Sequence, residues 1–241
     1  MSGSPLESPI AITNPIQAAS EVFYKPRVVF ETLAQKDNWS WIPFVIVVAF
    51  MVLPSVLYFN LLDTTWYIDQ MARASFPQGS PAEIENFKAM IPEDSLAFSA
   101  YFGPIAFVII FAIYAAVYAI ATRNDETNVQ GYTDWYGAMW WISMPMVVNG
   151  LLACVLIATQ EHGAQISSAY LAPLSVAFVM GMDMTTPMFN FWLGIRLDML
   201  WSIVLAGYCV KAWTGFSMPK SLIVGALPFI LGTLIGLVFA M

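Results

Sequence analysis

The chain has 241 residues, of which 59% are apolar and 10% are charged, and its formal net charge is −7. Because soluble domains carry about 25% charged residues, this composition excludes an ordinary soluble protein. The acidic balance and the lack of a basic cluster argue against nucleic-acid binding. The single histidine, His162, excludes a multi-histidine metal site, and the cysteines Cys154 and Cys209 fall inside apolar runs as small hydrophobic residues.

The N-terminal region precedes any long apolar run. Residues 1–13 are rich in Ser and Pro, and we predict a disordered tail there. Asn14-Pro15 predicts a helix start, because Asn caps helices and Pro fits the first helical position. We expect two short amphipathic helices over residues 14–37, separated at Lys25-Pro26, that lie on the membrane surface. Packing of the same residues on a helix bundle is the alternative.

The stretch 38–62 contains no Asp, Glu, Lys or Arg. Its 25 residues would form a helix of about 38 Å, which exceeds the hydrocarbon core of about 30 Å. Trp39 and Trp41 lie at one end and Tyr58 lies near the other, where amphipathic rings meet the headgroups. We therefore predict a first transmembrane helix over about 39–61.

Four more stretches are apolar and long enough to cross the bilayer, and we predict spans at about 97–121, 136–159, 191–213 and 221–241. The loop between the first two spans contains a capping box, Ser80-Pro81-Ala82-Glu83, which predicts a small amphipathic helix outside the bilayer. The apolar run 170–180 is too short to span, and we interpret it as a re-entrant or interfacial half-helix. The predicted fold class is an all-α, polytopic membrane bundle of five transmembrane helices, formed by residues 38–241.

The orientation follows from the distribution of Lys and Arg among the loops. The loop after the first span carries only two of them, Arg73 and Lys88, and Arg196 is a third if it belongs to that side. The opposite side carries six: Lys25, Arg27, Lys36, Arg123, Lys211 and Lys220. We therefore expect a cytoplasmic N-terminus and, with five spans, a C-terminus on the opposite side.

Three groups of residues, in this order, resemble the Yip1 family of five-span membrane proteins. They are the lead-in 23–26 with 39–43, the stretch 131–145 in which Pro145 interrupts a helix, and the segment 197–201. The resemblance implies a cytosolic N-terminus and five helices. Eukaryotic relatives act in Golgi and ER vesicle traffic and bind small GTPases. The short segment before the first span is closer to prokaryotic members, so we expect a bacterial inner-membrane protein and do not transfer GTPase binding.

Charged residues near the start of the fourth span are the candidate site. A charge at the bilayer centre costs about 2.5–3.5 kcal/mol on insertion scales, so it needs a partner or water. The i, i+2 spacing of Arg196 and Asp198 places them on different helix faces, so we expect separate partners, with Asp183 as the candidate for Arg196. One interpretation is a polar site for an ion, a lipid headgroup or a proton. The other is a pair at the interface where the span begins.

Small residues in the last span form a second candidate feature. Gly232 and Gly236 make a GxxxG motif, and Gly225 lies on roughly the same helix face. Such a face allows another helix to approach closely. We weigh two uses of it, packing within the chain and association between copies as a homo-oligomer.

The sequence contains no nucleophile elbow, HExxH motif or phosphate-binding loop, so we predict neither an enzyme nor a cofactor. We expect a non-enzymatic protein that organises membranes or acts as a scaffold. Its expected partners are membrane lipids, other membrane proteins or a second copy. The alternative is a small transporter or channel for an ion, a lipid or a small solute, with its path at Arg196, Asp198 and Asp183.

Overall fold

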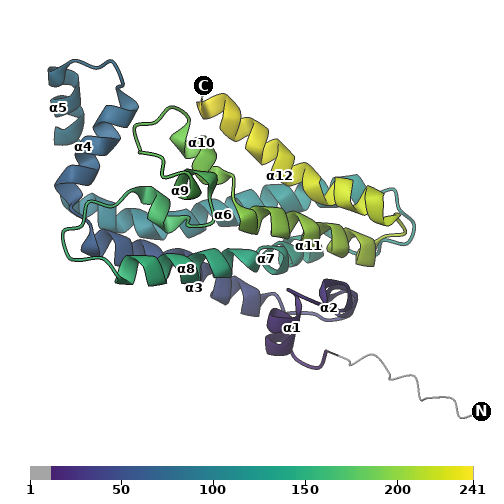
Figure 1. The fold of residues 1–241 in the computed structure, drawn as a ribbon. Coiled ribbons are helices and arrows are strands. Elements are labelled where there is room, and N and C mark those ends of the chain that lie inside the picture. The colour runs from purple at the N-terminus through teal and green to yellow at the C-terminus, as the bar shows by residue number, and fades with distance from the viewer. Residues whose placement is uncertain (1–11, 241) are drawn as a thin grey trace, which may run out of the picture.

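A computed structural model describes residues 12–240, except for the side chains of residues 93, 94, 97, 99, 100, 239 and 240. The predicted disordered tail, residues 1–13, therefore lies almost entirely outside the described residues. Within the described part, every regular element is a helix, which confirms the all-α prediction. The long helices run side by side along one axis of the molecule (Figure 1).

Among the described residues, four stretches of helix are long and apolar enough to cross a membrane. They belong to α3 (Trp41–Leu61), α6 (Glu93–Thr122), the consecutive pair α7 (Tyr132–Ile142) and α8 (Pro145–Ala158), and α12 (Met218–Ala240). The predicted spans 39–61, 97–121, 136–159 and 221–241 coincide with these helices. The break between α7 and α8 lies directly before Pro145, which has no N–H to continue the helical hydrogen bonds.

The predicted continuous helix over 191–213 is not what the structure contains. Instead, α10 (Phe189–Gly194) ends, Ile195 and Arg196 are extended, and α11 (Leu197–Trp213) begins. The 17 residues of α11 measure about 26 Å, which is less than a hydrocarbon core of about 30 Å. The break therefore shortens the fourth predicted span.

The segment before α10 folds back along the bundle. In place of the predicted half-helix over 170–180, it contains a 3₁₀ turn, η1 (Ser168–Leu171), and one turn of helix, α9 (Val176–Val179). The buried Asn149 of α8 holds the backbone between them. Its Nδ2 donates to the carbonyl of Leu171 (3.1 Å), and its Oδ1 accepts from the N–H of Leu174 (3.3 Å).

One end of the bundle carries a helical hairpin of α4 (Thr64–Ser75) and α5 (Pro81–Ala89) (Figure 1). The capping box of α5 is present as predicted. Sequence reasoning missed α4, whose first turn is capped by the Asp63 carboxylate accepting from the N–H of Trp66 (3.0 Å). The Asp63 N–H in turn donates to the carbonyl of Ala164 (3.0 Å), which joins this hairpin to the loop after α8.

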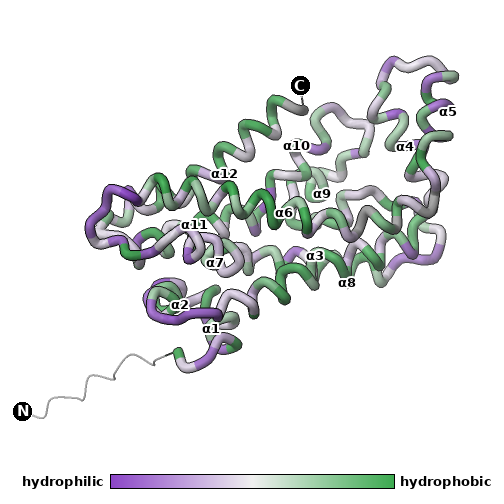
Figure 2. The backbone as a smooth tube through the Cα atoms, turned by 180° about the vertical axis from the view of Figure 1, so that it is seen from behind, coloured by the Kyte–Doolittle hydropathy of each residue, from purple (hydrophilic) through white to green (hydrophobic). Residues whose placement is uncertain are grey.

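At the opposite end, the turn after α6 meets the turn between α11 and α12. The Gly215 N–H donates to Asp125 Oδ1 (3.2 Å), and the Thr127 hydroxyl donates to the same oxygen. The Thr127 hydroxyl, followed by the Gly215 N–H, holds the pKa of Asp125 below its usual range. Hydrophilic residues gather at these turns and at the α4–α5 hairpin, while the helices between them are mostly apolar (Figure 2).

The two N-terminal helices, α1 (Pro15–Glu21) and α2 (Pro26–Leu33), pack on the bundle near these two turns. Asn14 caps α1 as predicted, since its Oδ1 accepts from the N–H of Gln17 (2.9 Å). The fully buried Phe30 offers its carbonyl to the indole N–H of Trp213, the last residue of α11 (2.9 Å). The apolar faces of α1 and α2 therefore face the protein. Contact with the membrane surface stays a prediction, carried by the exposed Ile16 and Tyr24.

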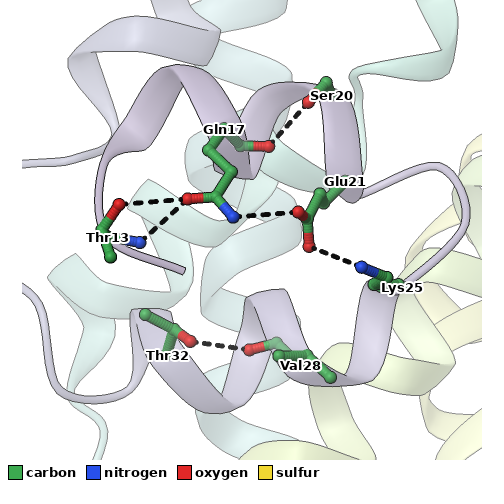
Figure 3. Close-up of polar contacts among 7 residues, drawn as sticks. All are labelled: Thr13, Gln17, Ser20, Glu21, Lys25, Val28 and Thr32. Carbon is green, nitrogen blue, oxygen red and sulfur yellow. Dashed lines mark hydrogen bonds and ion pairs between the residues drawn. The ribbon is translucent and has the colours of Figure 1, made fainter. Parts of the chain in front are cut away.

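A short polar network links α1 to the start of α2 (Figure 3). Glu21 is only 6% exposed, and its two oxygens lie near different partners. Gln17 Nε2 donates to Oε1 (2.9 Å), and the Lys25 ammonium lies 3.5 Å from Oε2. A buried carboxylate needs such partners, so this network stabilises the turn between the two helices.

Candidate functional site

The candidate site is built on the backbone break between α10 and α11. There the extended Arg196 lies beside Ser175 in an antiparallel bridge. The Val176 N–H donates to the carbonyl of Ile195, and the Leu197 N–H donates to the carbonyl of Leu174, both at 3.0 Å. These bonds satisfy backbone groups that the break removes from the helix, and they fix Arg196 as the residue before α11.

Arg196 and Asp198 form an ion pair with each other. Arg196 Nη2 lies 2.9 Å from Asp198 Oδ2, and the Asp198 side chain is 1% exposed while that of Arg196 is 21% exposed. The expectation that the two need separate partners is wrong. It assumed that both residues are helical, whereas Arg196 has an extended backbone (φ −131°, ψ 149°) that turns its side chain toward the first turn of α11.

Asp183 is not the partner of Arg196. It lies between α9 and α10 as an exposed residue, and among the described residues the guanidinium has its ion pair with Asp198. The local pair suffices because Asp198 belongs to the first turn of α11, where the helix dipole also favours a negative charge. Two buried atoms of the pair, Asp198 Oδ1 and Arg196 Nε, have no hydrogen-bond partner among the described residues.

An apolar groove of about 370 Å³ lies beside the pair, between α8 and α11. Asp198 is the one charged residue in its wall, and the other lining residues include Phe23, Pro145, Leu174 and Trp201. Leu197, at the mouth of the groove, is 63% exposed. This lining suits an apolar chain and gives no polar lining for a hydrated ion. The described residues include no group of three or more His, Cys, Asp or Glu side chains that could hold a metal ion.

The three candidate glycines of α12 have different surroundings. A Cβ added at Gly225 would lie 2.6 Å from the backbone nitrogen of Gly207, so this glycine allows α12 to approach α11. A Cβ at Gly232 would collide with the hydroxyl of Tyr114 on α6, whereas a Cβ at Gly236 would meet no atom within 4 Å. Gly225 and Gly232 thus serve contacts within the chain, and Gly236 alone is open to another molecule.

Sequence reasoning singled out Arg196 and Asp198, but it missed both their pairing with each other and the strand-like pairing of the backbone that positions them. Leu174 to Val176 and Ile195 to Leu197 lie inside apolar runs, and the hydrophobic period of such runs does not distinguish a buried helix from a buried extended segment. One local signal could have indicated the break: Gly194 lies immediately before it, and glycine destabilises a helix.

A helical bundle with several apolar helices long enough to cross a bilayer defines an integral membrane protein of the multi-spanning class. The family model for the Yip1 domain matches residues 20–240, and the chain belongs to the Yip1 family. Comparisons with curated proteins and with solved structures gave no match.

The Arg196→Met variant tests how much the Arg196–Asp198 ion pair stabilises the fold. It leaves the buried Asp198 carboxylate without its cation, so we expect the free energy of unfolding to fall by about 3 kcal/mol, the lower end for breaking a buried pair. Titration with denaturing detergent in mixed micelles measures this change. The matched control, Asp183→Ala, removes an exposed charge and should change stability by less than about 0.5 kcal/mol. Equal stability of the two variants would contradict the pairing.

Proposed function

We propose that this chain is a non-enzymatic Yip1-type protein of a bacterial inner membrane that acts as a scaffold for partner proteins. The observation that carries the proposal is an uncovered stripe on α6. Five aromatic or aliphatic side chains between residues 98 and 109 of this helix are each more than 50% exposed: Phe98, Tyr101, Phe102, Ile105 and Ile109.

The proposed topology has five spans, with α11 and the segment before it as the fourth. Hydrogen bonds join the basic segments at one end of the bundle. Gly215 bonds to Asp125, and the Gln130 side chain donates to the carbonyl of Ala34 (3.2 Å). The α4–α5 hairpin lies at the other end. Since loops rich in Lys and Arg stay in the cytoplasm, this grouping supports a cytoplasmic N-terminus and an opposite C-terminus.

Single cysteines test this topology. In a background with Cys154 and Cys209 replaced by Ala, we introduce Glu126→Cys at the basic end or Gln78→Cys between α4 and α5, where both residues are exposed. A membrane-impermeant maleimide added to intact cells or spheroplasts should label Gln78→Cys, and should label Glu126→Cys only after lysis. The reverse pattern would invert the orientation. Tags that place both chain ends in one compartment would exclude five spans.

A transport function has weaker support. Arg196 and Asp198 form an ion pair with each other, and the groove beside them is apolar. An ion that entered this groove would lose its hydration shell and gain one already paired carboxylate. That exchange is unfavourable because burying an unpaired charge is costly.

Flux through proteoliposomes separates the two functions. We expect proton and potassium leak rates equal to those of protein-free vesicles, for both the wild type and Arg196→Met. Vesicles with an added ionophore provide the positive control. A wild-type flux well above the leak that Arg196→Met abolishes would favour the transporter and remove the basis for the scaffold.

Photo-crosslinking tests the stripe itself. A photoreactive amino acid at Ile109, on the stripe, should give discrete protein adducts in cells. The matched position is Val155 on α8, which is 64% exposed and should give lipid adducts only. Adducts of twice the chain mass would identify a second copy as the partner. Lipid adducts alone at Ile109 would contradict a scaffold that uses this surface.

A further inference from the structure

A second cavity, of about 700 Å³, lies near the basic end of the bundle. Its walls are formed by the loop between α2 and α3, the first turn of α3, most of α7, and single residues of α2, α6 and α11, namely Leu33, Val108 and Trp213. It shares no lining residue with the groove beside Asp198. What it binds is therefore a separate question, and the answer does not depend on the scaffold function.

The polar rim of the cavity carries one cation and two carboxylates. Lys36, Asp37 and Asn38 come from the loop before α3, and Asp134 comes from the first turn of α7. Asn38 has a left-handed backbone (φ 62°), which Asn tolerates better than most residues and which turns this loop into α3. The rim thus has a net charge of −1 and presents both signs within one cavity.

These charges are available to a ligand. No carboxylate of the described residues lies within 4.0 Å of Lys36 Nζ, which lies 5.9 Å from the centre of the Trp39 ring. Asp37 is exposed and makes no ion pair within the described part of the chain. Asp134 uses Oδ2 to accept the Gly131 N–H (2.7 Å). The Lys36 and Asp37 charges therefore have only solvent or a ligand to neutralise them.

The inner wall of the cavity is aromatic and contains an unsatisfied donor. Phe44 and Trp140 form this wall, and Phe44 packs edge-on against Trp140 with 4.7 Å between ring centres. Trp141 also lines the cavity. It is 1% exposed, and its indole N–H has no acceptor among the described residues. A buried donor without an acceptor is costly, so a ligand oxygen brought to this wall would be stabilised.

The depth of the cavity matches the headgroup level of a bilayer. Its charged rim directly precedes Trp41, the first residue of a membrane-spanning helix. Its floor reaches Trp140, eight residues into the span that begins at Tyr132, or about 12 Å along the helix. Trp41 and Val108 line the cavity and are 65% and 37% exposed, so they mark its open side. A ligand with a polar head and apolar chains fits these positions.

We propose that this cavity binds the headgroup of a zwitterionic phospholipid with a primary ammonium, such as phosphatidylethanolamine. Lys36 pairs with the phosphate, and the ammonium donates hydrogen bonds to the carboxylates of Asp37 and Asp134. The aromatic faces add cation–π attraction to the ammonium. The ester oxygens approach the Trp141 indole, and the acyl chains leave past Trp41 and Val108. The extra negative charge on the rim disfavours anionic lipids.

Native mass spectrometry of the full chain released from nanodiscs tests this proposal. The nanodiscs contain equal amounts of phosphatidylethanolamine and phosphatidylglycerol. The wild type should retain the ethanolamine lipid in preference. Asp37→Asn should lower the ratio of retained phosphatidylethanolamine to phosphatidylglycerol about threefold, the effect of losing one ion pair at the protein surface. Lys36→Gln should reduce the retention of both lipids. The control, Glu126→Gln, removes an exposed acid at the same end and should match the wild type.

Two results would overturn the assignment. One is wild-type retention of phosphatidylglycerol equal to or above that of phosphatidylethanolamine. The other is an unchanged lipid ratio in Asp37→Asn. A further arm adds soluble glycerophosphoethanolamine, which has the same head but no chains. It should fail to displace the lipid at matched concentration, and displacement would identify a free headgroup compound as the ligand instead of a membrane lipid.

Discussion

The need to pair every backbone N–H and C=O away from water governs the least regular part of this protein. Within a bilayer no solvent is available to replace a lost helical hydrogen bond. Before α11 the chain is non-helical at residues 172–175, 180–188 and 195–196. The first and last of these stretches bond to each other, and the Asn149 side chain accepts the N–H of Leu174 in the first of them. The break before α11 is tolerated because the backbone groups beside it are bonded inside the protein.

The same arrangement explains why a charged pair sits inside an apolar bundle. The extended backbone at Arg196 allows a residue two positions from Asp198 to reach its carboxylate, which a continuous helix would prevent. The ion pair then offsets the cost of burying Asp198, and the groove beside it stays apolar. The pair lies at the start of α11, where each charge neutralises the other. The groove beside it is therefore suited to apolar occupants.

Local signals in the sequence predicted much of this fold. Asn14-Pro15, the Ser80–Glu83 capping box and Pro145 each act through the backbone of their own turn, so their effects do not depend on distant residues. The four long apolar helices are equally local, because length and composition decide them. The helix α4 also has a local signal, because Asp63 caps its first turn. The sequence analysis did not use this signal, since the surrounding stretch is polar.

The features that escaped prediction depend on residues far apart in the chain. The break before α11 needs Ser175, some twenty positions earlier, and the headgroup cavity combines the loop before α3 with the starts of α3 and α7. The partner assigned to Arg196 was wrong for a related reason, since its backbone conformation follows from that distant pairing. A periodic pattern reports which residues are apolar, and it does not report which segments meet.

The contact between Phe30 and Trp213 has a consequence for biosynthesis. The two residues are separated by 183 positions, so the ribosome completes α2 long before it makes the residue on which α2 packs. At about 5–20 residues per second, the delay is about 10–40 s. During this interval the side of α2 that packs on α11 has no α11 to cover it. The packing of α2 on the bundle is therefore completed only after α11 has been made.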